Sequence, residues 1–238
     1  INTIAVRVGE RAGIGNIYRF TTRELGITTF LSKDKAVAPM VLGASTLGVT
    51  PLEMASAYSI FGSGGSYTAP HCYIALERGS GKALLVPEHP AKQVVDTDTA
   101  YIMNRLLRGV MTGAGTGSGY SVQGEMDCVG KTGTTSDDRD HWFIGLTPYY
   151  VTASWYGYDD NLSLSVNYKA HPPTLAWRNI MARAQQNLSY KEFPTDANVV
   201  SVEYCTASGD AAGANCPARK TGYYKADALP KSTCKLHG

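Results

Sequence analysis

Apolar residues recur every three or four positions in three stretches of the chain, a spacing that predicts amphipathic helices. The first helix is predicted to begin at Pro51, with Thr50 as its cap and Glu53 three residues after the cap. Its apolar side chains at helical spacing are Leu52, Ala55, Tyr58 and Phe61. The glycine-rich run at residues 62–65 ends it.

The second predicted helix starts after Asp96 or Asp98, either of which can cap it. Its apolar face consists of Ala100, Met103, Leu106, Leu107 and Val110. The third covers residues 175–188, with Trp177, Ile180, Met181 and Ala184 on one side. Near the start of the chain, residues 3–8 fit either a helix or a strand, and Asn2 could cap such a helix.

Shorter apolar runs predict strands. Residues 73–76 and 83–86 flank a Gly-Ser-Gly turn and predict a hairpin. Three further runs, at residues 128–135, 141–146 and 150–158, are joined by loops so short that their strands must be antiparallel. The order of elements predicts an α+β fold in which helices flank an antiparallel sheet.

The chain changes character after about residue 190, where we expect irregular structure apart from a short strand at residues 199–204. Two parts are therefore predicted. Residues 1–189 form a main domain, and residues 190–238 form a cysteine-containing C-terminal extension.

Three of the five cysteines lie in this extension, namely Cys205, Cys216 and Cys234, whereas Cys72 and Cys128 stand alone. A cysteine-rich tail favours disulfide bonds formed in an oxidising compartment. The odd number of cysteines keeps free thiols as an alternative. A zinc site is disfavoured against both, because no Cys-x-x-Cys pair occurs and the five histidines are scattered.

The composition is that of a globular protein, with 43% hydrophobic and 18% charged residues among 238. The net charge of +2 predicts no basic surface for a nucleic-acid partner. No apolar run approaches the roughly 20 residues that span a bilayer. Because the chain opens at Ile1 without an initiator Met or a signal peptide, we expect it to start within a longer protein.

The most informative segment is Gly-Lys-Thr-Gly-Thr-Thr at residues 130–135, which places a cation, hydroxyls and a glycine on one strand. Alternation puts Lys131 and Gly133 on one face and Thr132 and Thr134 on the other. A glycine inside a strand permits close approach by a ligand. A lysine beside hydroxyls can bind a carboxylate, and a free backbone N–H there can stabilise an oxyanion.

Three interpretations of this segment compete. The simplest is an exposed surface strand. A phosphate-binding loop requires glycine at position 125 and a helix after the lysine, but position 125 is Glu125, Gly124 is one residue too far, and an acidic turn follows. The third interpretation is the Lys-Thr-Gly box of serine acyl-transferases.

The neighbouring sequence favours the third interpretation. Residues 130–160 closely resemble class A penicillin-binding proteins, which carry a Lys-Thr-Gly-Thr strand, an acidic turn, an Asp-x-Trp-Phe strand, a Gly-x-Thr-Pro turn and a Trp-x-Gly-Tyr-Asp strand. The residues that match the last three motifs are Asp140, Trp142, Phe143, Gly145, Thr147, Pro148, Trp155, Gly157, Tyr158 and Asp159. Residues 47–70 and 96–117 also resemble that family, so the resemblance covers Asn2 to about Asn187 in order. The cysteine-bearing tail resembles C-terminal extensions of some Gram-positive members.

The resemblance implies the fold shared by penicillin-binding transpeptidases and serine beta-lactamases. It implies a D,D-transpeptidase that cross-links peptidoglycan stem peptides through a serine acyl-enzyme and is acylated by beta-lactams. Asn2 and Lys131 would be catalytic, and Thr132, Gly133 and Thr134 would bind substrate. No metal or organic cofactor is implied. A glycosyltransferase domain and a membrane anchor are expected upstream, which places the enzyme at the outer face of the cytoplasmic membrane.

The attacking serine is expected outside this chain. In the family, a Ser-x-Asn motif precedes a stretch similar to residues 3–6, so Asn2 would be its asparagine, Ile1 its middle residue, and the serine would lie just upstream. The family's nucleophile lies in an earlier Ser-x-x-Lys motif. Ser32 and Lys35 fit that spacing, but they follow the Ser-x-Asn position and lie in a polar stretch, so we interpret them as a chance match.

Two alternatives to a transpeptidase stay open. One is a related acyl-enzyme hydrolase, either a D,D-carboxypeptidase or a beta-lactamase. The other is a non-catalytic penicillin-binding module that senses wall peptides. The glycine-rich loop at residues 113–119 departs from the family pattern, and its path near the site is not predicted.

Overall fold

The computed structural model describes residues 2–122, 126–164 and 171–237. Ile1, which the resemblance assigns to the Ser-x-Asn motif, lies outside the described residues, as do Gly124 and Glu125, which exclude a phosphate loop. Each helix that the structure describes is too short or too polar to cross a bilayer.

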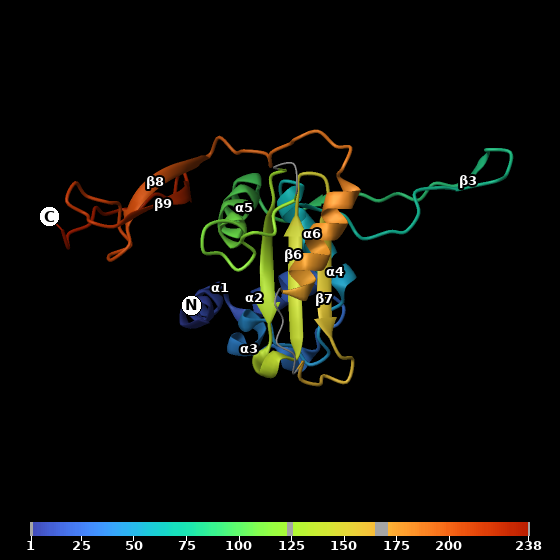
Figure 1. The fold of residues 1–238 in the computed structure, drawn as a ribbon, viewed down its shortest axis with the longest axis horizontal. Coiled ribbons are helices and arrows are strands. Elements are labelled where there is room, and N and C mark those ends of the chain that lie inside the picture. The colour runs from blue at the N-terminus through green and yellow to red at the C-terminus, as the bar shows by residue number, and fades with distance from the viewer. Residues whose placement is uncertain (1, 123–125, 165–170, 238) are drawn as a thin grey trace.

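A three-stranded antiparallel sheet lies at the centre of the fold (Figure 1). Its strands, in spatial order, are β5 (Val129–Thr134), β6 (Asp140–Leu146) and β7 (Val151–Gly157). The pairing of β5 with β6 runs without a break in register, from Val129 opposite Leu146 to Thr134 opposite His141. The predicted antiparallel strands are therefore confirmed, and β5 forms one edge of the described sheet.

Helices cover this sheet as the sequence predicts for an α+β fold. They are α4 (Pro51–Gly62), α5 (Thr97–Met111) and α6 (Pro172–Ala184). α6 packs across β6 and β7, α4 contacts the same two strands, and α5 lies against β5. In Figure 1, α6 crosses in front of the sheet and α4 lies behind it.

The core under α6 centres on Phe143 and Trp177, which are fully buried and meet edge to face with 5.1 Å between ring centroids. Two strand positions beneath these rings require glycine. A Cβ atom at Gly145 would lie 2.3 Å from the Trp177 ring, and one at Gly130 would lie 2.5 Å from the Phe143 ring. The aromatic core can therefore rest directly on the backbone of β5 and β6.

One residue of the predicted apolar face of α5, Leu106, and two residues of the predicted face of α6, Ile180 and Ala184, are exposed. Leu106 and Ile180 are 64% and 50% exposed, so neither lies in the core. The buried side of α5 instead includes Asn104, whose Nδ2 donates to the carbonyl oxygen of Phe61 over 2.7 Å. The polar side chain can be buried because it satisfies a carbonyl near the end of α4, a partner that apolar periodicity does not reveal.

The N-terminus of α4 is the predicted capping box. The backbone N–H of Glu53 donates to Thr50 Oγ1 over 3.1 Å, and the Glu53 carboxylate accepts the Thr50 N–H over 2.9 Å. Glu53 also accepts the backbone N–H of Thr28 over 2.7 Å. Partial burial raises the pKa of Glu53, but these hydrogen bonds outweigh burial and lower the pKa to about 2.

Residues 2–42 contain helices and short helical turns, and no strand is found among them. The elements are α1 (Asn2–Ala12), α2 (Ile14–Arg19), the π-helical turn η1 (Phe20–Glu24), the 3-10 turn η2 (Ser32–Asp34) and α3 (Val37–Leu42). α1 packs against α2 and α3. Asn2 is the first residue of α1 and not a cap in front of it, which corrects the capping prediction.

The predicted hairpin exists but its strands are shorter and shifted. β2 (Leu76–Glu77) pairs antiparallel with β3 (Ala83–Leu85), so only the end of the predicted 73–76 strand is paired. At the base of the hairpin, β1 (Ser66–Tyr67) pairs with β4 (Lys92–Gln93). The hairpin projects away from the sheet in Figure 1, so few core contacts extend its strands.

The C-terminal extension is more regular than predicted. β8 (Val199–Cys205) contains the expected strand at 199–204 and pairs antiparallel along its whole length with β9 (Arg219–Lys225). The prediction missed β9, because Arg219, Lys220 and Lys225 give that strand a polar character. This two-stranded sheet contacts α5 and lies beside the main body in Figure 1.

Candidate active site

Lys131 lies in the middle of the edge strand β5, and its side chain is exposed. Its Nζ donates to the carbonyl oxygen of Thr132 over 2.6 Å. Desolvation by the surrounding protein lowers the pKa of the Lys131 ammonium. The strand therefore presents a cation that is accessible to a ligand yet less hydrated than a free surface lysine.

The hydroxyl of Thr132 meets a second hydroxyl from a different segment. Thr116 Oγ1 and Thr132 Oγ1 lie 2.7 Å apart, within hydrogen-bond distance. Thr116 belongs to the glycine-rich loop after α5, whose path the sequence left open. The loop thus runs beside β5 and brings a second hydroxyl to Thr132, the strand residue next to Lys131.

Two glycines let this loop fold back on the end of α5. The N–H of Gly117 donates to the carbonyl oxygen of Val110 over 2.8 Å. A Cβ atom at Gly115 would lie 2.3 Å from the carbonyl oxygens of Gly109 and Val110. Only glycine fits such a close approach of backbone to backbone, so the glycines place Thr116 against β5.

The acidic turn after β5 is held by Asp140, the first residue of β6. The backbone N–H of Asp140 donates to Thr135 Oγ1 over 2.8 Å, and its carboxylate accepts the indole N–H of Trp155 over 2.8 Å. Asp137 and Asp138 in the turn have positive φ angles of 61° and 49°. Asp140 of the Asp-x-Trp-Phe motif and Trp155 of the Trp-x-Gly-Tyr-Asp motif therefore hold the carboxyl end of β5 in place.

Gly133 and Thr134 complete the segment in the predicted order. Gly133 pairs with Trp142 and Thr134 with His141 across the unbroken register with β6. A Cβ atom at Gly133 would lie 3.1 Å from Cβ of Trp142, so a larger residue there would crowd the pair. Because β5 is an edge of the described sheet, its other side has backbone groups free to pair with an extended ligand.

Asn2 is not joined to this strand by a hydrogen bond in the part of the chain that the structure describes. It is exposed at the start of α1. The structure thus brings together Lys131, Thr132, Gly133 and Thr134 on one strand and adds Thr116. Sequence reasoning missed Thr116, and the repeated glycines around it were the available signal.

Ser32 and Lys35 do not form a nucleophile–base pair. Ser32 begins the 3-10 turn η2, and Lys35 Nζ lies 4.4 Å from the ring centroid of Tyr18. The turn is built around Asp34, which accepts the backbone N–H groups of Leu31 and Thr46 over 2.7 and 2.9 Å. This arrangement supports the interpretation of the spacing as a chance match.

The expected disulfide bonds are absent among the described residues, where all five cysteines are free. Instead, the ligand atoms of Cys205, Cys216, Cys234 and His237 lie within 4.8 Å of one another. The disulfide prediction was wrong because it weighed only cysteine number and composition. Cys234 and His237 have a Cys-x-x-His spacing, which can serve a metal in the same way as Cys-x-x-Cys.

Two family models match the chain. The model of the penicillin binding protein transpeptidase domain matches residues 8–160, and the model of the penicillin-binding protein 1A C-terminal domain matches residues 195–238. The chain therefore belongs to the family of penicillin-binding protein transpeptidase domains. It corresponds to a C-terminal part of the class A proteins of that family.

Curated relatives agree with this assignment. Penicillin-binding protein 1A of Clostridium botulinum (strain Langeland) is 34% identical over 209 residues, which cover 88% of this chain and 25% of the relative. Penicillin-binding protein 1A of Clostridium tetani is 30% identical over 248 residues, covering 99% of this chain and 31% of the relative. The chain thus spans about a quarter to a third of the length of these relatives.

Solved structures share the fold. Penicillin-binding protein 1A from Haemophilus influenzae superposes with a TM-score of 0.78 at 23% identity, covering 98% of this chain and 39% of that one. The PonA1 protein from Mycobacterium tuberculosis, in complex with penicillin V, gives a TM-score of 0.63 at 24% identity over 73% of this chain and 50% of that one. The predicted penicillin-binding transpeptidase fold is confirmed.

Proposed function

We propose that the chain forms the substrate-gripping part of a peptidoglycan D,D-transpeptidase. The observation that carries the proposal is Lys131 on an open edge strand, next to the paired hydroxyls of Thr132 and Thr116. A cation and hydroxyl donors beside free backbone groups suit an extended peptide that ends in a carboxylate. The family membership supplies the reaction class.

The proposed roles follow from the position of each group on β5. Lys131 places positive charge beside the substrate carboxylate and moves protons during the reaction. The hydroxyls of Thr132 and Thr134 bind that carboxylate, and Gly133 lets the substrate backbone approach. The backbone N–H of Thr134 forms one half of the oxyanion hole, a contribution of roughly 3 kcal/mol per donor.

Asn2 is proposed to hold the substrate amide and to orient the lysine of the Ser-x-x-Lys motif. This role requires the segment upstream of the chain, because Asn2 does not contact β5 by a hydrogen bond among the described residues. The nucleophilic serine is proposed to lie in that upstream segment.

The proposed reaction has two acyl-transfer steps. The serine oxygen attacks the carbonyl carbon of the peptide bond between the two terminal D-alanines, the C–N bond breaks, and D-alanine leaves with the serine proton. The amino group of a second stem peptide then attacks the ester carbon. The serine recovers its proton, and the new amide bond is the cross-link. Beta-lactams are proposed to acylate the same serine.

The whole protein is proposed to carry a glycosyltransferase domain and a membrane anchor upstream, at the outer face of the cytoplasmic membrane. Within this chain, the transpeptidase part is proposed to end near residue 189, and the extension to start at residue 190. No cofactor takes part in the proposed chemistry.

Fluorescent penicillin labelling of the protein extended through its Ser-x-x-Lys segment tests the proposal. Lys131→Ala is expected to slow acylation by about 10²-fold or more, because it removes the charge that acts on the substrate and on the proton. Lys82→Ala, which removes a lysine of the distant hairpin, is the matched control and should label normally. Normal labelling of the Lys131 variant would refute the assigned role.

The position of the nucleophile has its own test. The 238-residue chain alone should form no stable adduct with labelled penicillin, whereas the extended protein should. A stable adduct on Ser32 of the chain alone would overturn the upstream assignment.

The alternatives give different outcomes in the same assay. Rapid loss of the penicilloyl group from the extended protein would indicate a beta-lactamase-like hydrolase. Stem peptide hydrolysed without transfer to an amine acceptor would indicate a carboxypeptidase. Failure of the extended protein to acylate at all would indicate a non-catalytic sensor module.

A further inference from the structure

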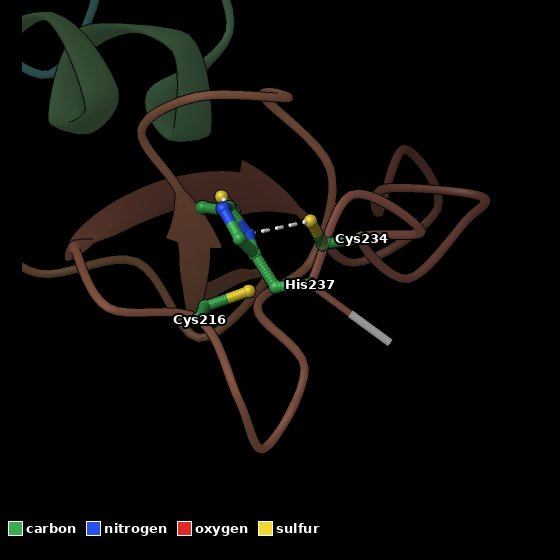
Figure 2. Close-up of side chains that lie close together, drawn as sticks. Cys216, Cys234 and His237 are labelled. Carbon is green, nitrogen blue, oxygen red and sulfur yellow. Dashed lines mark hydrogen bonds between the residues drawn. The ribbon is translucent and has the colours of Figure 1, made fainter.

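We propose that Cys205, Cys216, Cys234 and His237 form a structural zinc site in the C-terminal extension. Figure 2 shows the side chains of Cys216, Cys234 and His237 pointing toward one another. All four ligand atoms lie within 4.8 Å of one another, and the three cysteines are buried. This site is separate from the β5 strand, and the proposal does not depend on the proposed function.

The distances fit a tetrahedral metal site. Bonds of about 2.3 Å to sulfur and about 2.0 Å to nitrogen, at tetrahedral angles, separate a sulfur and a nitrogen ligand by about 3.5 Å. Nδ1 of His237 lies 3.4 Å from Sγ of Cys234 and 3.5 Å from Sγ of Cys205. One imidazole nitrogen therefore already stands at the expected distance from two of the three sulfurs.

The fold delivers the four ligands from three separate segments of the chain. Cys205 is the last residue of β8, and Cys216 follows a turn closed by the bond from its N–H to the carbonyl oxygen of Gly213. Cys234 is held by the bond from its N–H to the carbonyl oxygen of Ala211 over 2.8 Å. His237 then returns toward the cluster three residues later. Convergence of three chain segments on one point is typical of a metal-centred turn cluster.

Apart from the β8–β9 ladder and its contacts with α5, the extension has only a small apolar core. Its buried cluster consists of the three cysteines, with Ala212 packed against it. A unit of about 50 residues rarely folds on so small an apolar core without disulfides or a metal. A metal can supply the missing free energy, because the liganded geometry exists only in the folded state.

A disulfide explains the cluster less well than a metal. One disulfide would join two of the three thiols and leave a buried thiol and the imidazole without a role. A metal uses all four groups at once. The N–H of Gly213 also donates to Sγ of Cys216 over 3.3 Å, a hydrogen bond of the kind that supports a metal-bound thiolate.

The ligand set selects zinc and a structural role. Three thiolates and one imidazole match the Cys3His set of closed tetrahedral zinc sites, with no open position for water or substrate. On binding, each thiol releases its proton to solvent, and the neutral imidazole donates its Nδ1 lone pair. The site with Zn²⁺ and three thiolates then carries a net charge of −1.

Metal analysis of the full chain tests the proposal directly. The chain is purified under reducing conditions with added zinc and without chelator, and its metal content is measured by mass spectrometry. About one zinc per chain is expected. Cys216→Ser should lose most of this zinc, whereas Cys72→Ser and Cys128→Ser, which remove the two cysteines outside the cluster, should keep it.

A second variant separates loss of metal from loss of folding. His237→Cys converts the set to four cysteines and should keep about one zinc per chain, because that set is also a closed zinc site. Replacement of zinc by Co²⁺ should give the sulfur-to-cobalt absorption and the d–d bands of a tetrahedral site. The Cys216→Ser variant should lack them while its main body keeps its far-ultraviolet circular dichroism.

Thiol counting distinguishes the metal from a disulfide. In chain prepared separately without reductant and denatured with chelator, alkylation should modify all five cysteines. Chain that contains no zinc, together with a disulfide between two of Cys205, Cys216 and Cys234, would overturn the proposal. So would zinc that stays bound in the Cys216→Ser variant.

Discussion

The buried cluster between α6 and the central sheet and the buried cluster of the extension differ in the side chains that fill them. The first contains Met111, Val122, Met126, Cys128, Phe143, Trp177 and Met181. The second contains three cysteines with Ala212 against them. The body can be stabilised by burying large apolar side chains, whereas the extension lacks such side chains and needs a cross-link of another kind. One chain thus combines two sources of stability, which separate experiments can remove.

Removal of zinc should produce the largest difference in stability between the main body and the extension. Structural zinc contributes on the order of 10 kcal/mol to small zinc domains, so its loss should unfold the extension. Hydrogen exchange should show β8 and β9 losing protection while β5 to β7 keep theirs. Equal loss in both sheets would show that the regions do not differ in this way.

Trp177→Ala should destabilise the main body and leave the extension unchanged. Loss of the fully buried indole against Phe143 leaves a cavity and should cost about 3–5 kcal/mol of the body's free energy of unfolding. Ile180→Ala on the same helix is the matched control, because Ile180 is half exposed and should change stability by about 0.5 kcal/mol or less. Chemical denaturation measures both, and zinc content should be unchanged in each.

Acid should weaken the body through Glu53. The folded-state pKa of Glu53, about 2, lies below the ordinary value of 4.5, so its contribution to stability is complete above pH 4.5 and is lost as the pH falls toward 2. The shift corresponds to at most about 3 kcal/mol, and screening of this partly exposed carboxylate by solvent should reduce the loss to about 2 kcal/mol. Glu53→Gln should be less stable than the parent at pH 7 by a similar amount, and the difference should shrink in acid. Because acid also protonates zinc ligands, the informative quantity is the difference between the two proteins. If the stability difference between Glu53→Gln and the parent stayed constant from pH 7 to acid pH, the lowered pKa of Glu53 would be contradicted.

The contact between the main body and the extension should contribute the least free energy of the features considered. Lys225 of β9 lies 2.7 Å from Asp98 and 3.4 Å from Asp96 at the start of α5, and the guanidinium carbon of Arg105 lies 5.1 Å from the Tyr223 ring centroid. Ion pairs near solvent contribute about 1 kcal/mol or less. A double-mutant cycle of Lys225→Ala with Asp98→Ala should give a coupling energy of that size. Lys220→Ala on the same strand should give no coupling with Asp98→Ala, and a coupling there would point to a general charge effect.

The sequence predicted those elements whose signals are local. Thr50, Pro51 and Glu53 form the predicted helix start because a capping box is set by four neighbouring residues. The three central strands follow from short loops between apolar runs. Leu106 and Ile180 were misplaced because burial depends on what packs opposite each helix face, and the carbonyl of Phe61 that draws Asn104 inward is 43 positions away in the sequence.

In the candidate sites, too, local signals could be predicted from the sequence and contacts between distant residues could not. Lys131 to Thr134 could be found because four adjacent residues carry the motif. Thr116 and Thr132 are 16 positions apart, so their contact depends on how the glycine loop turns back on α5. The cysteine cluster was missed as a metal site because its ligands span residues 205–237, and only the pairing of β8 with β9 and the following turns brings them together.

The edge position of β5 has a consequence for self-association. An unpaired strand edge is also a template on which a second copy of the same strand could add, which is a common start of aggregation. Two β5 strands pairing antiparallel through this edge would bring their Lys131 ammonium groups near each other across the new ladder. Lys131 in the middle of the strand can therefore attract an anionic ligand and, by charge repulsion, disfavour pairing of β5 with a second copy of itself.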